Sequence, residues 1–192
     1  MRRALVVGIN HYEHIKSLNG CVNDLKATHQ FLKRYAAAQN LEFLPKILTN
    51  KTATRENIID GFSQFNAAQN GDSCFFYYSG HGSQSVAPQA FWTNPNGMNE
   101  SIVCHDSRLK GGRDLMDKEL GYLIWKATKG KEIHFLAMMD CCHSGSATRS
   151  LKNSRSRNVA PNFTPLNVED YLGYQEYEKK NGSVNPPPSE HV

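Results

Sequence analysis

Four short apolar runs recur along the chain, and each is followed by polar or turn-forming residues. They cover residues 3–9, 41–48, 73–78 and 133–139. Runs of this length, rich in β-branched and aromatic side chains, are typical of strands in a sheet that is covered on both faces. Pro45 lies within the second run and cannot donate to a strand ladder, which favours the edge of the sheet. The pattern therefore predicts four strands, of which the second is peripheral.

Between these runs, apolar side chains recur at helical spacing on three segments. Residues 22–38 carry one apolar face and one basic face, which predicts an amphipathic helix. Thr54 is a favoured N-cap residue for a second helix, with Asn57 three positions on, and a third helix covers residues 117–129. Strands that alternate with helices imply right-handed crossovers. We expect an α/β fold with a mostly parallel sheet and helices on both faces.

Two stretches lack this periodicity. Residues 83–113 are rich in Gly, Pro, Asn and Ser, which predicts long loops with a small hairpin. From Ser146 onward the chain is polar and basic, and a structureless connection of that length is unusual inside a compact domain. We therefore expect an ordered domain over residues 1–148. Residues 149–192 would then form a polar linker that leads to a further strand beyond this chain.

Composition narrows the class of protein. The 192 residues are 39% hydrophobic with a formal net charge of +4, an ordinary balance for a globular domain. The five cysteines have no disulfide-framework spacing, which predicts free thiols and a cytoplasmic location. No segment is apolar for long enough to span a membrane. A membrane partner is therefore not expected. The basic residues Lys152, Arg155 and Arg157 lack interleaved aromatic side chains, so a nucleic-acid partner is not expected either.

Candidate chemistry lies at the ends of the third and fourth runs. In an open parallel sheet, sites form beyond the carboxyl ends of the strands. The third run continues into Ser79-Gly80-His81-Gly82 and the fourth into Asp140-Cys141-Cys142. If these strands are neighbours, an imidazole and a thiol meet at one edge, and nucleophilic catalysis needs that pair. Taken singly, such a His or Cys is usually structural, so the pair carries the inference.

Side-chain alternation distinguishes the two adjacent cysteines. Residues two apart on an extended segment point to the same side, so Asp140 and Cys142 share a side, and Cys141 points into packing. This makes Cys142 the predicted nucleophile and His81 its base. The backbone N–H groups of Gly82 and Cys142 are the predicted oxyanion hole.

The segments Tyr-Ser-Gly-His-Gly-Ser-Gln, with His81, and Asp-Cys-Cys-His-Ser-Gly, with Cys142, resemble the two catalytic motifs of the metacaspases. The likeness extends through Gly8-Ile9-Asn10 and the stretch from Leu18 to Asp24, and it covers about residues 3–146. The resemblance implies a caspase-like three-layer fold with a six-stranded sheet, of which four strands are present here. It gives residues 1–148 the part of the large catalytic subunit, with a C-terminal small-subunit segment or chain as partner.

The resemblance also implies the substrate and the pocket that holds it. Metacaspases cut protein or peptide substrates after Arg or Lys, in a pocket lined by residues that match Cys21, Asp24, Ser79 and Asp140. Two carboxylates suit a guanidinium or an ammonium and repel an aspartate side chain. The sequence therefore predicts a cysteine endopeptidase with a Cys-His dyad. The alternatives are a catalytically silent caspase-like interaction module and a paracaspase or clostripain-like peptidase.

Two further expectations concern regulation. The chemistry requires no cofactor, but many metacaspases are activated by calcium, and Asp106 and Asp117 match acidic residues of that site. Lys118 and Arg149 stand where further acids are expected, which argues against tight binding and leaves calcium open as an activator. The linker also carries basic residues that fit the chain's own pocket, either as self-cleavage sites or as a bound pseudosubstrate. These candidates are Arg149, Lys152, Arg155, Arg157, Lys179 and Lys180.

Overall fold

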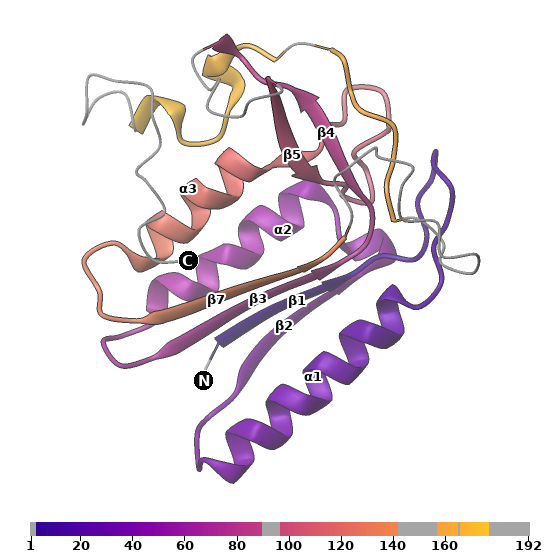
Figure 1. The fold of residues 1–192 in the computed structure, drawn as a ribbon. Helices are drawn as coiled ribbons and strands as arrows, with labels where there is room; N and C mark the ends of the chain where they lie inside the picture. Colours follow the sequence, from indigo (N-terminus) through magenta and orange to yellow (C-terminus); the bar gives the residue numbers. More distant parts are fainter. Residues whose placement is uncertain (1–2, 90–96, 142–156, 165, 177–192) are drawn as a thin grey trace.

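A four-stranded parallel sheet forms the centre of the computed structural model, which describes residues 3–89, 97–141, 157–164 and 166–176 (Figure 1). The strand order is β2 (Leu44–Thr49), β1 (Arg3–Gly8), β3 (Ser73–Ser79) and β7 (His134–Asp140). The four predicted strands and their parallel arrangement are confirmed. Strand β2 lies at one end of the sheet, as Pro45 predicts.

Helices cover both faces of the sheet and make a three-layer α/β fold (Figure 1). Helix α1 (Cys21–Ala38) packs on β1 and β3, while α2 (Arg55–Phe62) and α3 (Asp117–Thr128) contact each other over the opposite face. The N-cap prediction is confirmed, because the Thr54 side chain accepts a hydrogen bond from the Asn57 N–H at 3.2 Å. Short 3-10 turns cover η1 (Asn50–Thr52), η2 (Ser63–Ala67) and η5 (Val168–Asp170).

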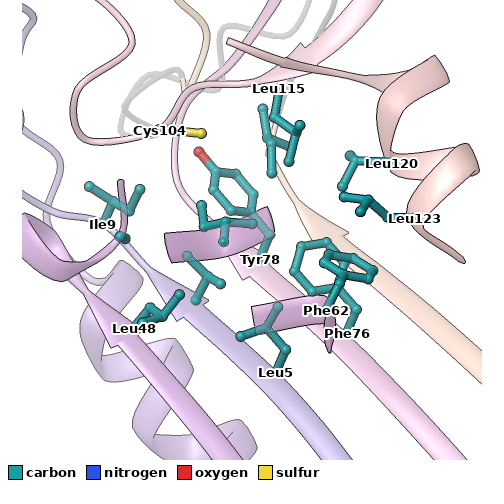
Figure 2. Close-up of a cluster of buried hydrophobic side chains, with 14 of the residues drawn as sticks. Leu5, Ile9, Leu48, Phe62, Phe76, Tyr78, Cys104, Leu115, Leu120 and Leu123 are labelled. Atoms are coloured by element: carbon teal, nitrogen blue, oxygen red, sulfur yellow. The ribbon is translucent and has the colours of Figure 1, made fainter. Parts of the chain in front are cut away.

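Side chains on successive strand positions separate into two apolar clusters. On the α1 face, Ala4, Val6, Phe75 and Tyr77 pack with Leu25 and Leu32. On the other face, Leu5, Phe76 and Tyr78 belong to a larger cluster with Phe62, Leu120 and Leu123 (Figure 2). This alternation of two buried faces explains why the central strands have continuous apolar sequences.

A second, antiparallel sheet continues from the carboxyl end of β3. Its strands are β4 (Gly82–Val86), β5 (Met98–Ile102) and β6 (Leu115–Met116), in that order. The small hairpin predicted within residues 83–113 is β4–β5, and β6 lies just beyond that stretch. Strand β5 buries two polar side chains, Asn99 and Ser101, and the Asn99 amide donates to the Tyr171 hydroxyl at 3.0 Å. A strand with polar side chains on both faces has no hydrophobic alternation to reveal it.

The C-terminal segments that the structure describes lie against this second sheet and α3 (Figure 1). Asn158 and Asn162 form parallel bridges with Gly82 and Ser85. Further along, Tyr171 is buried, and the Leu172 N–H donates to the Glu119 carboxylate at 3.0 Å.

Strand β7 lies at the end of the central sheet opposite β2. Its Leu136 and Met138 side chains are 41% and 48% exposed, unusual values for apolar residues of a sheet strand. In the part of the chain that the structure describes, no helix is both long and apolar enough to cross a bilayer.

Candidate active site

The carboxyl ends of β3 and β7 lie side by side, as the predicted meeting of a histidine and a cysteine requires. In the parallel register of these strands Ser79 pairs with Asp140. In the sequence, His81 and Cys142 each follow two residues later. Cys142 itself lies outside the described residues, and its role as nucleophile and oxyanion-hole donor stays a prediction.

His81 is buried and held at both ring and backbone. Its Nε2 lies 2.7 Å from the main-chain carbonyl oxygen of Lys16, and its ring lies 5.0 Å from the Tyr12 ring. Because a carbonyl only accepts, this contact places the ring proton on Nε2 and leaves the Nδ1 lone pair available. Among the described residues Nδ1 has no hydrogen-bond partner. The arrangement suits a base that receives a proton at Nδ1.

Burial lowers the pKa of His81, against the opposing effect of the Lys16 carbonyl. A lower pKa keeps the imidazole neutral near pH 7, the form that accepts a proton. The side chain is therefore prepared for general-base chemistry by its surroundings as well as by its tautomer.

Two tyrosine hydroxyls fix the backbone of His81. The His81 N–H donates to the Tyr12 hydroxyl at 2.9 Å, and the Tyr78 hydroxyl donates to the His81 carbonyl at 2.7 Å. Gly80 passes so close to them that a Cβ there would stand 2.7 Å from the Tyr12 oxygen. Neither Tyr12 nor the Lys16 carbonyl is predicted from the sequence, because both act through tertiary contacts that leave no periodic signal.

The four predicted pocket residues come together beside this histidine. Asp24 lies in the first turn of α1, Ser79 ends β3 and Asp140 ends β7. The Ser79 hydroxyl donates to the Asp140 carboxylate at 3.2 Å. Cys21 is fully buried beside Ser79, and burial raises the pKa of its thiol, so it forms an uncharged wall.

A side chain of the protein itself occupies the pocket. The Arg157 guanidinium donates to Asp24 at 2.8 Å and to the Ser79 hydroxyl at 2.9 Å, and it also pairs with the Asp140 carboxylate. Burial opposes the charge, but the two carboxylates outweigh it and raise the pKa of Arg157. The pocket therefore holds a guanidinium between two carboxylates.

The backbone of Arg157 is held as well. Its carbonyl oxygen accepts a hydrogen bond from the Gly82 N–H at 2.8 Å. Gly82 is one of the two predicted oxyanion-hole donors, and 2.8 Å lies within the range found for such donors. Of the six basic residues named as self-cleavage candidates, only Arg157 falls in the described ranges. The others, Arg149, Lys152, Arg155, Lys179 and Lys180, lie outside them.

The two calcium candidates each accept a hydrogen bond from the protein backbone. Asp106 accepts a hydrogen bond from the Arg55 N–H at 2.8 Å, and Asp117 accepts from the Lys118 N–H at 2.8 Å. Burial raises the pKa of Asp117, against the effect of Lys118. Within the described ranges no group of three His, Cys, Asp or Glu side chains could hold a metal ion. These residues do not form a calcium cage as placed, and a calcium effect stays a prediction.

A model of the metacaspase, peptidase C14 domain matches residues 2–150. Metacaspase-1 of Mycosarcoma maydis is 32% identical over 153 residues, covering 76% of this chain and 36% of that protein. Metacaspase-1 of Schizosaccharomyces pombe is 32% identical over 151 residues, which cover 76% of this chain and 34% of that protein. Metacaspase-1 of Plasmodium falciparum is 32% identical over 205 residues, which cover 96% of this chain and 32% of that protein. The chain thus spans about a third of the length of these relatives.

The fold has a counterpart among solved structures. A crystal structure of a Geobacter sulfurreducens protein superposes with a TM-score of 0.63 at 25% identity, covering 83% of this chain and 58% of that one. The family model covers both β3 and β7. Because it describes metacaspases, it favours that family over the paracaspase and clostripain-like alternatives. From its sheet, its buried histidine and these matches, the chain belongs to the metacaspase family of cysteine peptidases.

Proposed function

We propose that this chain carries the catalytic centre of a cysteine endopeptidase that hydrolyses peptide bonds after Arg or Lys. The observation that carries the proposal is the position of Arg157, with its guanidinium between Asp24 and Asp140 and its carbonyl on the Gly82 N–H. A substrate arginine bound in this way offers its side chain to two carboxylates and its carbonyl oxygen to a backbone donor. Hydrolysis after a basic residue requires both contacts.

In the proposed mechanism Cys142 is the nucleophile and His81 the general base. Nδ1 of His81 takes the thiol proton, and the thiolate sulfur attacks the carbonyl carbon of the basic residue. The oxygen becomes an oxyanion that the Gly82 and Cys142 N–H groups stabilise. The imidazolium then protonates the amide nitrogen as the C–N bond breaks, which leaves a thioester. Water attacks the thioester with His81 again as base and releases the acid product.

The charge of the pocket supports the substrate preference. A guanidinium forms paired hydrogen bonds with carboxylates, and an ammonium gains the same attraction as a point charge. An aspartate side chain in the same place would face Asp24 and Asp140, and like charges that close together repel.

Hydrolysis of fluorogenic peptides that end in Arg, Lys or Asp before the reporter tests the proposal. Because the chain spans about a third of its relatives' length, the assay is run on this chain alone and joined to its C-terminal continuation. We expect hydrolysis of the Arg and Lys peptides only, and none by the Cys142→Ala variant. Efficient hydrolysis of the Asp peptide, with the basic peptides ignored, would refute the pocket assignment. Binding of basic peptides without turnover by either form would favour the silent interaction module.

We further propose that Arg157 restrains the enzyme until the bond between Arg157 and Asn158 is cut. A tethered segment reaches a high effective concentration at its site, up to roughly millimolar for a short flexible tether. Substrates in solution must compete with it. The same contacts that block the pocket also present the Arg157 carbonyl for attack, so one segment serves as pseudosubstrate and as self-cleavage site.

A C-terminal small-subunit segment or chain is the proposed partner of β7. The exposed side chains of Leu136 and Met138 on this end strand support it, because a partner would remove that apolar surface from water. The proposed location is the cytoplasm, where thiols such as those of Cys74 and Cys104, which form no disulfide, stay reduced.

A further inference from the structure

Strand β4 has two hydrogen-bonding edges, and a segment of the chain beyond the catalytic motifs takes one of them. On one edge β4 pairs with β5 in antiparallel register. On the other, the Gly82 N–H donates to the Arg157 carbonyl at 2.8 Å, and the Val159 N–H donates to the Gly82 carbonyl at 3.0 Å. Further on, the Asn162 N–H donates to the Gln84 carbonyl at 2.8 Å. The residues that follow Arg157 therefore run parallel to β4.

A buried serine on β4 is fixed as a donor towards this segment. The Ser83 hydroxyl lies 3.2 Å from the Val159 carbonyl and 3.1 Å from the Ala160 carbonyl, and it accepts a hydrogen bond from Arg108 at 2.9 Å. A guanidinium has donors only, so the hydroxyl must use its oxygen for Arg108 and its proton for a peptide carbonyl. Asp114, itself buried, holds Arg108 at 2.6 Å. The Ser83 hydroxyl is thus held ready to donate to a main-chain carbonyl of a peptide that lies along β4.

The side chains of the segment differ in what they contact. Val159 packs against the main core cluster, whereas Ala160 is exposed. Pro161 has no N–H to donate. It lies between the bridges at Asn158 and Asn162, where the segment has one residue more than β4, so no ladder hydrogen bond is lost there. The second position after Arg157 is thus selective for an apolar side chain, and the third is not.

We propose that the outer edge of β4 is a binding site for the residues that follow the basic residue of a substrate. It takes an extended peptide parallel to β4, with an apolar second residue and a carbonyl on Ser83. The chain's own residues 158–162 are the present occupant. This inference rests on the proposed function, because that function makes Arg157 the stand-in for a substrate's basic residue. Strand addition of this kind draws affinity from the peptide backbone and selectivity from alternate side chains.

Backbone methylation of a substrate tests the site without altering the protein. The enzyme is the Arg157→Ala chain, whose own segment holds the pocket less well. The peptides carry Arg followed by Asn-Val-Ala-Pro-Asn-Phe, the sequence of residues 157–163. N-methylation at the valine removes the donor to the Gly82 carbonyl. The same methyl at the alanine is the matched control, because the Ala160 N–H makes no ladder bond within the described segment.

We expect the valine methyl to lower kcat/KM by about 3- to 10-fold and the alanine methyl by less than about 2-fold, the range of one hydrogen bond. Equal effects of the two methyl groups would overturn the β4 site while leaving the proposed function intact. If no peptide is hydrolysed, the proposed function fails. The site is then judged by fluorescence anisotropy with labelled peptides and the chain that carries Cys142→Ala and Arg157→Ala. A weaker Kd for the valine methyl alone supports the site, and equal Kd values overturn it.

A pair of variants tests the serine. In the Arg157→Ala chain, the ratio of kcat/KM between this long peptide and one with a reporter directly after Arg measures the contribution of the trailing residues. We expect Ser83→Ala to lower the ratio by about 3- to 10-fold, the effect of one hydrogen bond, because the main-chain bonds to Gly82 and Gln84 remain. Ser85→Ala, the same change two positions along β4, should preserve it, since the Ser85 hydroxyl has no partner among the described residues. Equal ratios in the two variants would show that Ser83 plays no part.

Discussion

The hydroxyl of Ser79 donates a 3.2 Å hydrogen bond to the carboxylate of Asp140, its register partner in the parallel pair β3–β7. Each of these residues precedes a predicted catalytic residue by two positions. The contact that joins these two predicted pocket residues therefore lies on the strand pair that precedes both predicted catalytic residues. The proposed recognition of the substrate side chain and the proposed chemistry both depend on that strand pair.

Replacement of the two adjacent cysteines should have opposite results. Cys142→Ala should abolish peptide hydrolysis, because it removes the nucleophile. Cys141→Ala should retain most of it, since the Cys141 side chain packs against the core cluster, and its loss costs about 1 kcal/mol of stability. Hydrolysis rates and melting temperatures of the two purified variants decide the point. Equal loss of activity in two folded variants would show that the alternation argument has the wrong phase.

Neutral replacements of the pocket carboxylates should weaken basic substrates. Asp24 and Asp140 are 40% and 46% exposed, so water screens their attraction in part. We expect Asp140→Asn and Asp24→Asn each to lower kcat/KM for Arg peptides by about 10- to 100-fold, mainly through KM. Asp60→Asn, which removes an exposed pair with Lys46, is the matched control and should change nothing. Retention of full activity by both pocket variants would place substrate recognition elsewhere.

The lowered pKa of His81 predicts a specific dependence on pH. The midpoint of its titration in the folded protein should lie below the ordinary pKa of 6.5, because burial disfavours the imidazolium. Stability from the neutral form is then present above 6.5 and is lost as the pH falls towards the pKa of the folded state. NMR of the imidazole in Cys142→Ala, which lacks the thiol, measures the titration. His81→Asn should remove this part of the pH dependence of unfolding, and a midpoint above 6.5 would contradict the argument.

Variants of Arg157 separate restraint from self-cleavage. Arg157→Ala should raise the initial rate against small Arg peptides several-fold and abolish any cut after this residue, whereas Arg157→Lys should keep the cut. Arg34→Ala, at an exposed position of α1, is the control for loss of a positive charge. Mass spectrometry of the intact chain identifies the fragments. If fragments that end at Arg157 form equally in the Cys142→Ala variant, another protease made them.

Calcium should have a weak effect on this chain. Asp117 is paired with Lys118, and Asp106 with the backbone of Arg55, so neither carboxylate is free to enter a cage without rearrangement. Titration of calcium against the activity of chelator-treated protein measures the effect, with magnesium as the control ion. We expect less than about a 2-fold change at millimolar calcium, because a cage needs six to eight oxygens. A sharp submillimolar requirement would show that the segment around Arg149 supplies ligands.

The central sheet could be predicted from the sequence because its strands are buried on both faces. Continuous apolar runs such as 73–78 result directly from that burial. The start of the second helix could be predicted as well, because Thr54 caps it through a local hydrogen bond. Strand β5 gives no such signal, since its Asn99 and Ser101 are buried by means of hydrogen bonds to distant partners. Hydrophobic periodicity detects apolar burial alone.

The candidate site also has residues that the sequence predicts and residues that it does not. His81 follows a strand end, and strand ends can be located from the apolar pattern. Tyr12 and Lys16 lie in the turn-rich stretch after β1, and their contacts with His81 depend on the path of that stretch in space. Arg157 is one of six basic residues after residue 148, and the sequence gives no reason to prefer it. Its carbonyl bonds to Gly82 at the start of β4, a tertiary contact that leaves no signal in the sequence.

The exposed apolar side chains of β7 have a consequence for the chain in solution. Within the described residues β7 pairs with β3 alone, and an open strand edge beside apolar side chains is a template on which another chain can add. Two copies of this chain that paired edge to edge along β7 would extend the sheet across both molecules, with Leu136 and Met138 close to the contact. The sedimentation coefficient should therefore rise with protein concentration. A charged substitution at Met138 should suppress the rise, so that preparations of this chain become easier to concentrate.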